Sequence, residues 1–277
     1  MPKRKIELNE IQPLELDILF KLVDYLEKNN ISYCTSGGTT LGAIRHKGFI
    51  PWDDDIDIYI PRKDYDKLMK ISEDVLIDGY ISIKRPGDKN YIYQFCKACN
   101  ENTVINEKNV SDPKYAIGIF VDIFPLDKHY DSKLKNKLLI AKTRWYRSLL
   151  ETASNQVNLS KKGSKRYIIK QAVRTLQKPL TLYWTVEKTA KHIDAMGRKM
   201  ESKSTHYLGD LVMKGNNNDD YYNADYFKTF IDGEFEGHKI KNPVGYHEYL
   251  TEMYGDYMKL PPKEQQIMHG FDAWYKD

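Results

Sequence analysis

Four aspartates fall within positions 53–57, in the run Trp52-Asp53-Asp54-Asp55-Ile56-Asp57-Ile58. Successive side chains of a strand point to opposite faces, so Asp53, Asp55 and Asp57 would line one edge while Asp54 points away. Carboxylates at this spacing repel one another unless cations neutralise them. Oxygen-only, acidic ligands suit Mg²⁺ or Mn²⁺, and the run therefore predicts a divalent metal site. Taken alone, the run is equally typical of a solvated acidic loop.

A glycine-rich turn, Ser36-Gly37-Gly38-Thr39, precedes the aspartates, between a β-prone stretch over 31–35 and a predicted short helix over 41–46. Consecutive glycines let backbone N–H groups approach a phosphate closely, and the positive end of the following helix points to the same place. A phosphate-binding turn followed by a strand that bears Asp-x-Asp is the layout of the nucleotidyltransferase fold of the polymerase beta type. In that fold, metals bridge the carboxylates and the phosphates of a nucleotide.

A third carboxylate is expected from a neighbouring strand. The run Phe120-Val121-Asp122-Ile123-Phe124 supplies one acid flanked by apolar residues. We therefore predict Asp55, Asp57 and Asp122 as the metal ligands. The alternative for Asp122 is a strand-end acid in a turn with Pro125 and Asp127.

The spacing of apolar residues predicts the elements that position these groups. Helices are expected over 14–26, 65–72 and 246–254, with a short one after Pro262, and strands over 55–60, 80–84, 91–99 and 117–124. The stretch 131–206 is predicted to be helical, with breaks near 161–164 and at Pro179.

These elements predict an α+β fold, in which a mixed sheet of the nucleotidyltransferase (polymerase beta-like) type is flanked by helices and carries a largely helical basic insert. We divide the chain into a catalytic core over 1–130, a basic helical segment over 131–206, and a C-terminal segment over 207–277 that completes the active site.

The composition is that of a folded enzyme. The 277 residues are 41% hydrophobic and 12% aromatic, which excludes disorder and collagen-like repeats. No window approaches the roughly 18 consecutive apolar residues of a membrane-spanning helix, and acidic residues follow the basic start where a signal peptide would be apolar. We therefore expect a cytoplasmic protein. Its three cysteines are expected to be structural thiols, because no second cysteine pair completes a zinc site.

Positive charge is concentrated in residues 133–203, which hold 18 Lys and Arg against 4 Asp and Glu. Such a segment suits a solvated surface, a nucleic-acid face, a membrane-surface patch or a track for an anionic polymer. Arg144, Trp145, Tyr146 and Arg147 interleave cations with aromatic rings, as interfacial helices and polyanion sites both do. The segment matches no nucleic-acid motif. Charge alone does not choose among the other three, and we expect no nucleic acid as partner. Given a phosphate-rich acceptor precursor carried on a lipid at the inner membrane surface, we expect the segment to contact both that acceptor and, peripherally, the anionic membrane surface.

Three stretches of the sequence closely resemble the LicD family, whose bacterial members are phosphorylcholine transferases and whose animal relatives are fukutin and fukutin-related protein. The longest runs from Gly38-Thr39-Thr40-Leu41-Gly42 through Asp55-Ile56-Asp57-Ile58. Asp122-Ile123-Phe124-Pro125-Leu126-Asp127 is similar to the family's later acidic strand, and Tyr254-Gly255-Asp256-Tyr257 through Pro261-Pro262 is similar to its C-terminal motif. The basic middle segment has no match, so the resemblance covers roughly half of the chain.

The resemblance implies metal-dependent transfer of phosphocholine from CDP-choline to a hydroxyl of a cell-surface glycopolymer precursor of the teichoic acid type, with release of CMP. Mg²⁺ or Mn²⁺ would neutralise the diphosphate for in-line attack. Asp122 would complete the metal site or take the acceptor hydroxyl's proton. The catalytic residues are then Asp53, Asp55, Asp57 and Asp122. The substrate-binding residues are Ser36, Gly37, Gly38, Thr39, Arg45, Lys47, Trp52 and Tyr254, with Arg45 and Lys47 directed to the phosphates.

The quaternary ammonium of choline is best held by aromatic faces. Trp52, Tyr254, Tyr257 and Trp274 are the candidates for such a cage. Three alternatives stay open: transfer of another CDP-linked group such as ribitol or glycerol phosphate, nucleotidyl transfer, and a non-catalytic scaffold that binds glycopolymer.

Overall fold

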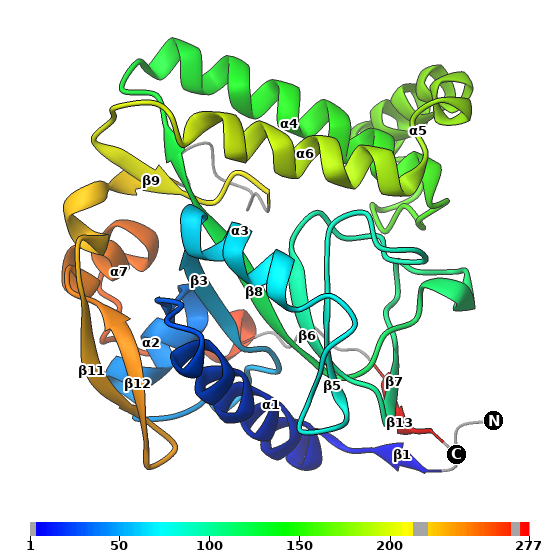
Figure 1. Ribbon diagram of the computed structural model, residues 1–277. Helices are drawn as coiled ribbons and strands as arrows, with labels where there is room; N and C mark the ends of the chain where they lie inside the picture. The colour runs from blue at the N-terminus through cyan, green and yellow to red at the C-terminus, as the bar shows by residue number, and fades with distance from the viewer. Residues whose placement is uncertain (1–3, 213–220, 267–271, 277) are drawn as a thin grey trace.

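The computed structural model describes residues 4–212, 221–266 and 272–276. At its centre lies an eight-stranded sheet in which β8 pairs with β9 and β6 and also with β3, which in turn pairs with β2 (Figure 1). The β3–β8 pair is parallel and the other described pairs are antiparallel, so the sheet is mixed. Its strands are β2 (Cys34–Thr35), β3 (Asp57–Pro61), β4 (Leu76–Ile77), β5 (Ile81–Lys84), β6 (Cys96–Asn100), β8 (Phe120–His129), β9 (Tyr207–Gly209) and β10 (Tyr221–Asn223). The predicted α+β class and mixed sheet are confirmed.

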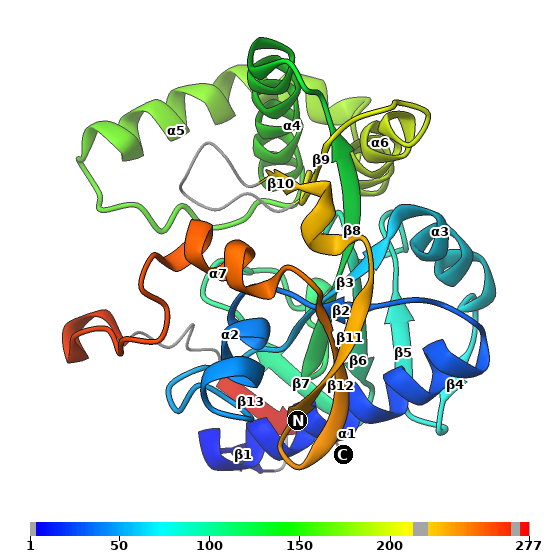
Figure 2. The same cartoon turned by 90° about the vertical axis from the view of Figure 1, so that its left-hand side faces the viewer.

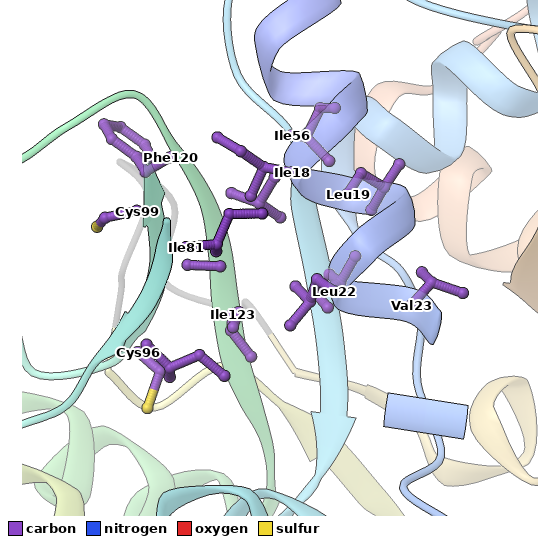
Figure 3. Packing of buried hydrophobic residues seen from close by; sticks show 14 of the residues in the cluster. Ile18, Leu19, Leu22, Val23, Ile56, Ile81, Cys96, Cys99, Phe120 and Ile123 are labelled. Atoms are coloured by element: carbon purple, nitrogen blue, oxygen red, sulfur yellow. The ribbon is translucent and has the colours of Figure 1, made fainter. Parts of the chain in front are cut away.

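Helix α1 (Leu8–Lys28) packs against the sheet and forms the main core with it (Figure 3). Ile18, Leu19 and Leu22 are fully buried at helical spacing, which places them on one face of the helix. The helix begins before the predicted position 14, because the Glu10 carboxylate accepts the Glu7 backbone N–H and so caps a polar first turn. Apolar periodicity does not reveal such a turn.

Several predicted boundaries in the catalytic core are wrong. The glycines lie inside helix α2 (Gly37–Arg45), which starts directly after Ser36 and not at position 41. Strand β3 begins at Asp57, so Asp53 and Asp55 lie in the extended segment before it.

Two further strands also differ from the prediction. Residues 91–95 form no strand, because the Tyr91 hydroxyl donates to the Phe95 carbonyl and holds the stretch in an irregular fold ahead of β6. Strand β8 begins at Phe120 and continues through Pro125 to His129, where the sequence predicted that it would end at 124. Pro125 is tolerated here because it lies between the β8 residues that pair with β6, 120–123, and those that pair with β9, 127–129, so its missing N–H falls outside both ladders.

The C-terminal segment adds a hairpin and a strand to the core. The hairpin β11 (Phe230–Phe235) and β12 (His238–Pro243) was missed, although its two-residue loop ends in a glycine and both loop residues have positive φ, +49° for Glu236 and +76° for Gly237. Helix α7 (Tyr246–Tyr254) has the predicted bounds. Three strands form a separate small sheet in the order β1, β13, β7: β1 (Lys5–Ile6), β13 (Asp272–Tyr275) and β7 (Thr103–Asn106). The three-part division of the chain stays a prediction, and strands of its third part pair with strands of its first.

The basic segment is helical, as predicted, and gathers above the sheet (Figures 1 and 2). It contains α4 (Lys133–Ala153), α5 (Lys165–Gln177), a 3₁₀ helix over Lys178–Leu182, and α6 (Val186–Met200). The breaks fall at Ser164, whose side chain caps α5, and at Pro179, as predicted. Within the ranges that the structure describes, no helix is both long enough and apolar enough to cross a membrane.

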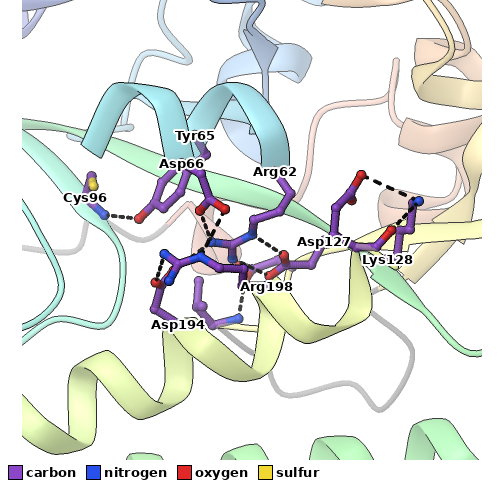
Figure 4. Close-up of polar contacts among 11 residues, drawn as sticks. Arg62, Tyr65, Asp66, Cys96, Asp127, Lys128, Asp194 and Arg198 are labelled. Carbon is purple, nitrogen blue, oxygen red and sulfur yellow. Dashed lines mark hydrogen bonds and ion pairs between the residues drawn. The ribbon is translucent and has the colours of Figure 1, made fainter. Parts of the chain in front are cut away.

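A buried group of ion pairs joins this segment to the core (Figure 4). Arg62, at the start of α3 (Arg62–Ile71), donates through Nε and Nη2 to both carboxylate oxygens of Asp127, at 2.7 and 2.9 Å, and through Nη1 to Asp194 of α6 at 2.6 Å. Arg198 of α6 bonds Asp194 and Asp66. We call these five residues the Arg62 cluster. A Cβ at Gly197 would stand 2.4 Å from the Asp127 carboxylate, so the close approach of α6 requires glycine there.

Candidate active site

Three charged residues stand in a row across neighbouring strands. Asp57 of β3 is in register with Asp122 of β8, and Asp122 is in register with Lys97 of β6. Directly paired residues point to the same face of a sheet. The Lys97 Nζ lies 2.5 Å from Asp122 Oδ1, and both side chains are almost fully buried. The predicted carboxylates of two different strands therefore meet, with a lysine beside them.

These carboxylates line a cavity of about 570 Å³. Asp53, Asp55, Asp57 and Asp122, which we call the acid cluster, all lie on its wall, whereas Asp54 is buried outside it. The alternation inferred from the sequence thus holds, even though regular strand pairing starts only at Asp57. The remaining wall residues are Gly37, Gly38, Leu41, Arg45, Ile50, Trp52, Phe124, Tyr254, Asp256, Tyr257, Lys259 and Pro261.

The acid cluster carries more negative charge than its surroundings balance. Asp57 Oδ1 is buried and has no hydrogen-bond partner among the described residues. Burial, followed by repulsion from Asp55 and Asp122, raises the pKa of Asp57 well above its usual value. Burial also raises the pKa of Asp122, to about 6, although the Lys97 ammonium opposes the shift. An added cation at this site would therefore lower the electrostatic free energy.

The donor atoms at the site fit a hard divalent cation. Asp55, Asp57 and Asp122 offer carboxylate oxygens alone, which is the ligand type that Mg²⁺ and Mn²⁺ prefer. The buried Asp57 Oδ1 has no hydrogen-bond partner among the described residues and is therefore available as a ligand. As the described side chains stand, no three acidic, histidine or cysteine groups are already arranged to hold a metal ion.

The start of α2 meets the acid cluster directly. The Asp57 backbone N–H donates to Thr39 Oγ1 at 2.8 Å, and the Gly37 N–H donates to the Tyr249 hydroxyl at 2.9 Å. A Cβ at Gly38 would stand 2.8 Å from Asp53 Oδ2, so glycine lets the carboxylate approach the helix. Gly37 has a φ of +48°, which favours glycine. Ser36 is buried at the N-cap position, but its side chain makes no cap hydrogen bond.

The other predicted binding residues separate into two groups. Trp52, Tyr254 and Tyr257 lie on the cavity wall. Arg45 also lines it, and its Nη1 donates to the Tyr257 carbonyl at 2.7 Å, so this guanidinium holds the C-terminal segment against the cavity. Lys47 stands outside the wall, in a turn where its φ is +61° and its carbonyl accepts the Glu236 N–H. Trp274 lines a different cavity, beside β7.

Sequence reasoning missed two buried charged residues. Lys97 interrupts an otherwise apolar strand, which is a signal in itself because lysine is almost never fully buried without a partner. Glu15 of α1 is fully buried, and neither carboxylate oxygen has a hydrogen-bond partner in the described part of the chain. Burial, with repulsion from Asp55 and Asp54, raises the pKa of Glu15 well above its usual value. Glu15 therefore adds to the imbalance of the site.

Comparisons with known proteins identify the family to which the chain is similar. The family model described as LicD/FKTN/FKRP, nucleotidyltransferase domain, matches residues 30–149. The lipopolysaccharide cholinephosphotransferase LicD of Haemophilus influenzae is 31% identical over 98% of this chain and 99% of its own. An uncharacterized protein of Rickettsia typhi is 34% identical over 47% of this chain and 40% of its own. These matches confirm the resemblance, the nucleotidyltransferase type of fold and the expectation of a transferase enzyme. The chain belongs to the LicD family.

Proposed function

We propose that this protein transfers phosphocholine from CDP-choline to a hydroxyl of a glycopolymer, with release of CMP and in dependence on Mg²⁺ or Mn²⁺. The observation that carries the proposal is the acid cluster, held at the start of α2 on the wall of a cavity large enough for a nucleotide. Similarity over nearly the full length to a protein named as a cholinephosphotransferase supports the choice of phosphocholine. A scaffold without activity would have no use for carboxylates that repel one another.

The residues of the cavity suggest how the donor is held. When bound, a divalent cation would neutralise the diphosphate and make the phosphorus a better target for attack. The glycines of α2 allow the diphosphate to lie close to the helix backbone, at the positive end of the helix. The Lys97 ammonium, 2.5 Å from Asp122 Oδ1, favours the ionised form of Asp122. Asp122 is therefore available both as a metal ligand and as the acceptor of the hydroxyl proton.

Aromatic residues favour choline over ribitol as the transferred group. Trp52, Tyr254 and Tyr257 lie on the wall of the same cavity as the carboxylates. Ring faces attract a quaternary ammonium, whereas a polyol would be held by hydrogen-bonding groups.

Calorimetry with CDP-choline, CDP-ribitol and CMP, each with Mg²⁺ and again with EDTA, tests the donor. We expect CDP-choline to bind more tightly than CDP-ribitol and only when Mg²⁺ is present. Preference for CDP-ribitol would change the transferred group, and tight binding in EDTA would contradict the metal. Release of CMP on addition of purified lipopolysaccharide or teichoic acid precursor then identifies the acceptor. Release of phosphocholine in place of CMP would indicate nucleotidyl transfer, because attack at the phosphorus next to the nucleoside transfers CMP and leaves the distal phosphate on choline.

We further propose that the basic segment contacts an anionic membrane surface. Leu134, Leu138 and Trp145 form an exposed stripe along α4, and Ile168 and Leu176 lie in a second exposed stripe on α5. The Gln177 side chain donates to the Trp145 carbonyl at 3.1 Å, so the two helices adjoin there. Apolar stripes bordered by Lys and Arg are typical of helices that lie in a membrane interface. The bordering basic residues are Lys133, Lys135, Lys137, Lys142, Arg144, Lys165, Arg166 and Lys170.

Vesicle flotation tests this contact. The protein should float with vesicles that contain phosphatidylglycerol but not with pure phosphatidylcholine, and roughly 1 M salt should weaken the binding. Replacing Leu176 and Leu182, which are 74% and 90% exposed, by serine should reduce recovery severalfold. Leu76→Ser removes a leucine that is 53% exposed on β4, outside the basic segment, and should leave recovery unchanged. Equal recovery with both vesicle types would refute the proposal.

A further inference from the structure

A second cavity, of about 320 Å³, reaches the acid cluster from other elements of the fold. Asp55 and Asp122 belong to its wall as well as to the wall of the first cavity. Its other sides come from the irregular stretch 91–95, from β6 and β8, and from the C-terminal part of α4. The two carboxylates therefore stand between two separate spaces, which is the arrangement that a reaction between two substrates requires.

The chemistry of the second wall differs from that of the first. Tyr93, Phe95 and Phe120 supply aromatic surface, and Gln94, Asn109 and Gln156 supply amides. The wall also holds charged groups of both signs, and its outer carboxylates are already bonded: Glu107 accepts from the Tyr93 hydroxyl and Glu151 from Arg174. Aromatic faces together with amides and bonded charges suit a ring that carries hydroxyl groups, because each hydroxyl both donates and accepts hydrogen bonds.

The aromatic rings of the second cavity already lie against a cation of the protein itself. The Lys97 ammonium already lies 3.3 Å from the ring centroid of Phe120 and 4.5 Å from that of Tyr93. A choline group in this cavity would therefore meet a positive charge beside the rings that would otherwise attract it. Because the Glu107 and Glu151 carboxylates of the same wall are already bonded by Tyr93 and Arg174, this arrangement favours a sugar over choline as the occupant.

The basic segment forms the outer side of the cavity. The Val157 N–H donates to the Asn109 carbonyl at 2.8 Å, and Asn109 Nδ2 lies 3.4 Å from Gln156 Oε1, so the residues after α4 are joined to the loop of Asn109. Arg174 of α5 bonds Glu151 of α4 at 3.0 Å and the Gln156 carbonyl at 2.7 Å. These contacts hold the amides of Asn109 and Gln156 in place on the wall, and they make the basic segment part of the second cavity.

We infer that the second cavity is the acceptor subsite and that it binds a neutral sugar ring of the glycopolymer. The inference rests on the proposed function. The sugar's hydroxyl oxygen forms a bond to the distal phosphorus of CDP-choline, while the bond from that phosphorus to the bridging oxygen breaks and its electron pair leaves with CMP. The hydroxyl proton passes to Asp122, which lines both cavities.

Two single variants, Gln156→Ala and Asn109→Ala, test the inference. The acceptor is lipopolysaccharide or teichoic acid precursor, whichever the parent protein modifies. The KM for acceptor should rise about tenfold in each variant, because each loses a hydrogen bond to the sugar. The Kd values for CDP-choline and CMP, measured by calorimetry with Mg²⁺, should stay within about twofold of those of the parent. Asn158→Ala, a change in the same loop but off the cavity wall, should leave the KM for acceptor unchanged.

Other outcomes overturn the inference in distinguishable ways. An unchanged KM for acceptor in both variants would show that the sugar lies elsewhere. Weaker binding of CDP-choline with unchanged binding of CMP would assign the cavity to choline. If the parent protein neither binds CDP-choline nor releases CMP, the proposed function itself fails and the acceptor subsite fails with it.

Discussion

The Arg62 cluster and the acid cluster both bury carboxylates, but Asp127 and Asp194 of the first are bonded by arginine, whereas Asp57 Oδ1 of the second has no hydrogen-bond partner among the described residues. Asp127 receives two hydrogen bonds from Arg62, and Asp194 is bonded by Arg62 and by Arg198. Burial opposes the charge of Arg62, yet attraction by Asp127 and Asp194 outweighs it and raises the pKa of Arg62. This cluster is complete within the protein, and its role is to join α6 to the sheet.

The acid cluster has one buried lysine for several carboxylates. Asp57 Oδ1 lacks a partner, and the adjoining Glu15 lacks one at both oxygens, within the described residues. A buried charge without a counter-charge destabilises a fold. Paired buried charges thus hold this molecule together, whereas the unpaired ones lie where we propose that cations and phosphates are bound. The following predictions test that distinction.

The largest effect is expected on turnover in Asp57→Asn. Loss of one metal ligand should reduce kcat by about 10³-fold or more, because charge stabilisation at the phosphorus is lost. At the same time the thermal midpoint should not fall, since a repelling buried charge is removed. CMP release and a melting curve in the same buffer give both values.

Asp54→Asn is the matched control, because Asp54 is a buried neighbour that does not line the cavity. It should retain far more activity than Asp57→Asn. The reverse ranking would place Asp54 at the metal and would contradict the register of the site.

Arg62→Met should cause the largest loss of stability. It leaves the buried carboxylates of Asp127 and Asp194 without their main partner, which should lower the free energy of unfolding by about 3–5 kcal/mol in denaturant titration. Arg198→Gln removes a side chain that is 48% exposed and should cost less than about 1 kcal/mol. Similar losses of unfolding free energy in the two variants would mean that burial does not determine how much each arginine of the cluster stabilises the fold.

Local patterns predicted much of this fold. The helical spacing of Leu19 and Leu22 and the alternation of Asp55 with Ile56 depend only on near neighbours in the chain, and both patterns were interpreted correctly. The break near 161–164 was also predicted, but not the role of Ser164 as the cap of α5. The glycine of the β11–β12 hairpin carried a usable signal that was overlooked.

Other features depend on contacts between distant parts of the chain. The row of Asp57, Asp122 and Lys97 requires the register of three strands that are not consecutive in the sequence. Sequence patterns predict which residues share a face but not which strands adjoin. The second cavity likewise depends on how α4 sits over the sheet. Its amides, such as Gln156, gave no local signal.

Lys97→Met should destabilise the protein in a pH-dependent way. At pH 8 in EDTA the loss should be about 3 kcal/mol, because Asp122 then loses the lysine ammonium that pairs with it in a buried site. Near pH 5 the loss should be smaller, since Asp122, whose pKa rises further without the lysine, binds a proton. Lys84→Met is the control, because Lys84 is the β5 residue in register with Lys97 but its side chain is 33% exposed. This variant should lose less than about 1 kcal/mol of unfolding free energy. A loss that does not depend on pH would indicate that Lys97 acts through packing alone.

The smallest expected effect is on thermal stability: Asp57→Asn should be more stable than the parent by an amount that depends on pH. The pKa of Asp57 is raised in the folded state, so the folded parent binds more protons than the unfolded chain between pH 4 and the raised pKa. Within that range the parent loses stability as pH rises, whereas the asparagine variant has no such proton to lose. In EDTA, the thermal midpoints of the two proteins should therefore coincide near pH 4 and differ by about 2–4 °C at pH 8.

Adding Mg²⁺ at pH 8 should reverse this difference, because a cation bound by the carboxylates stabilises the parent and not the variant that has lost a ligand. A difference that is constant from pH 4 to pH 8 would show that the asparagine acts through shape or hydrogen bonding. In that case the repulsion around Asp57 would not be the property that distinguishes the acid cluster from the Arg62 cluster.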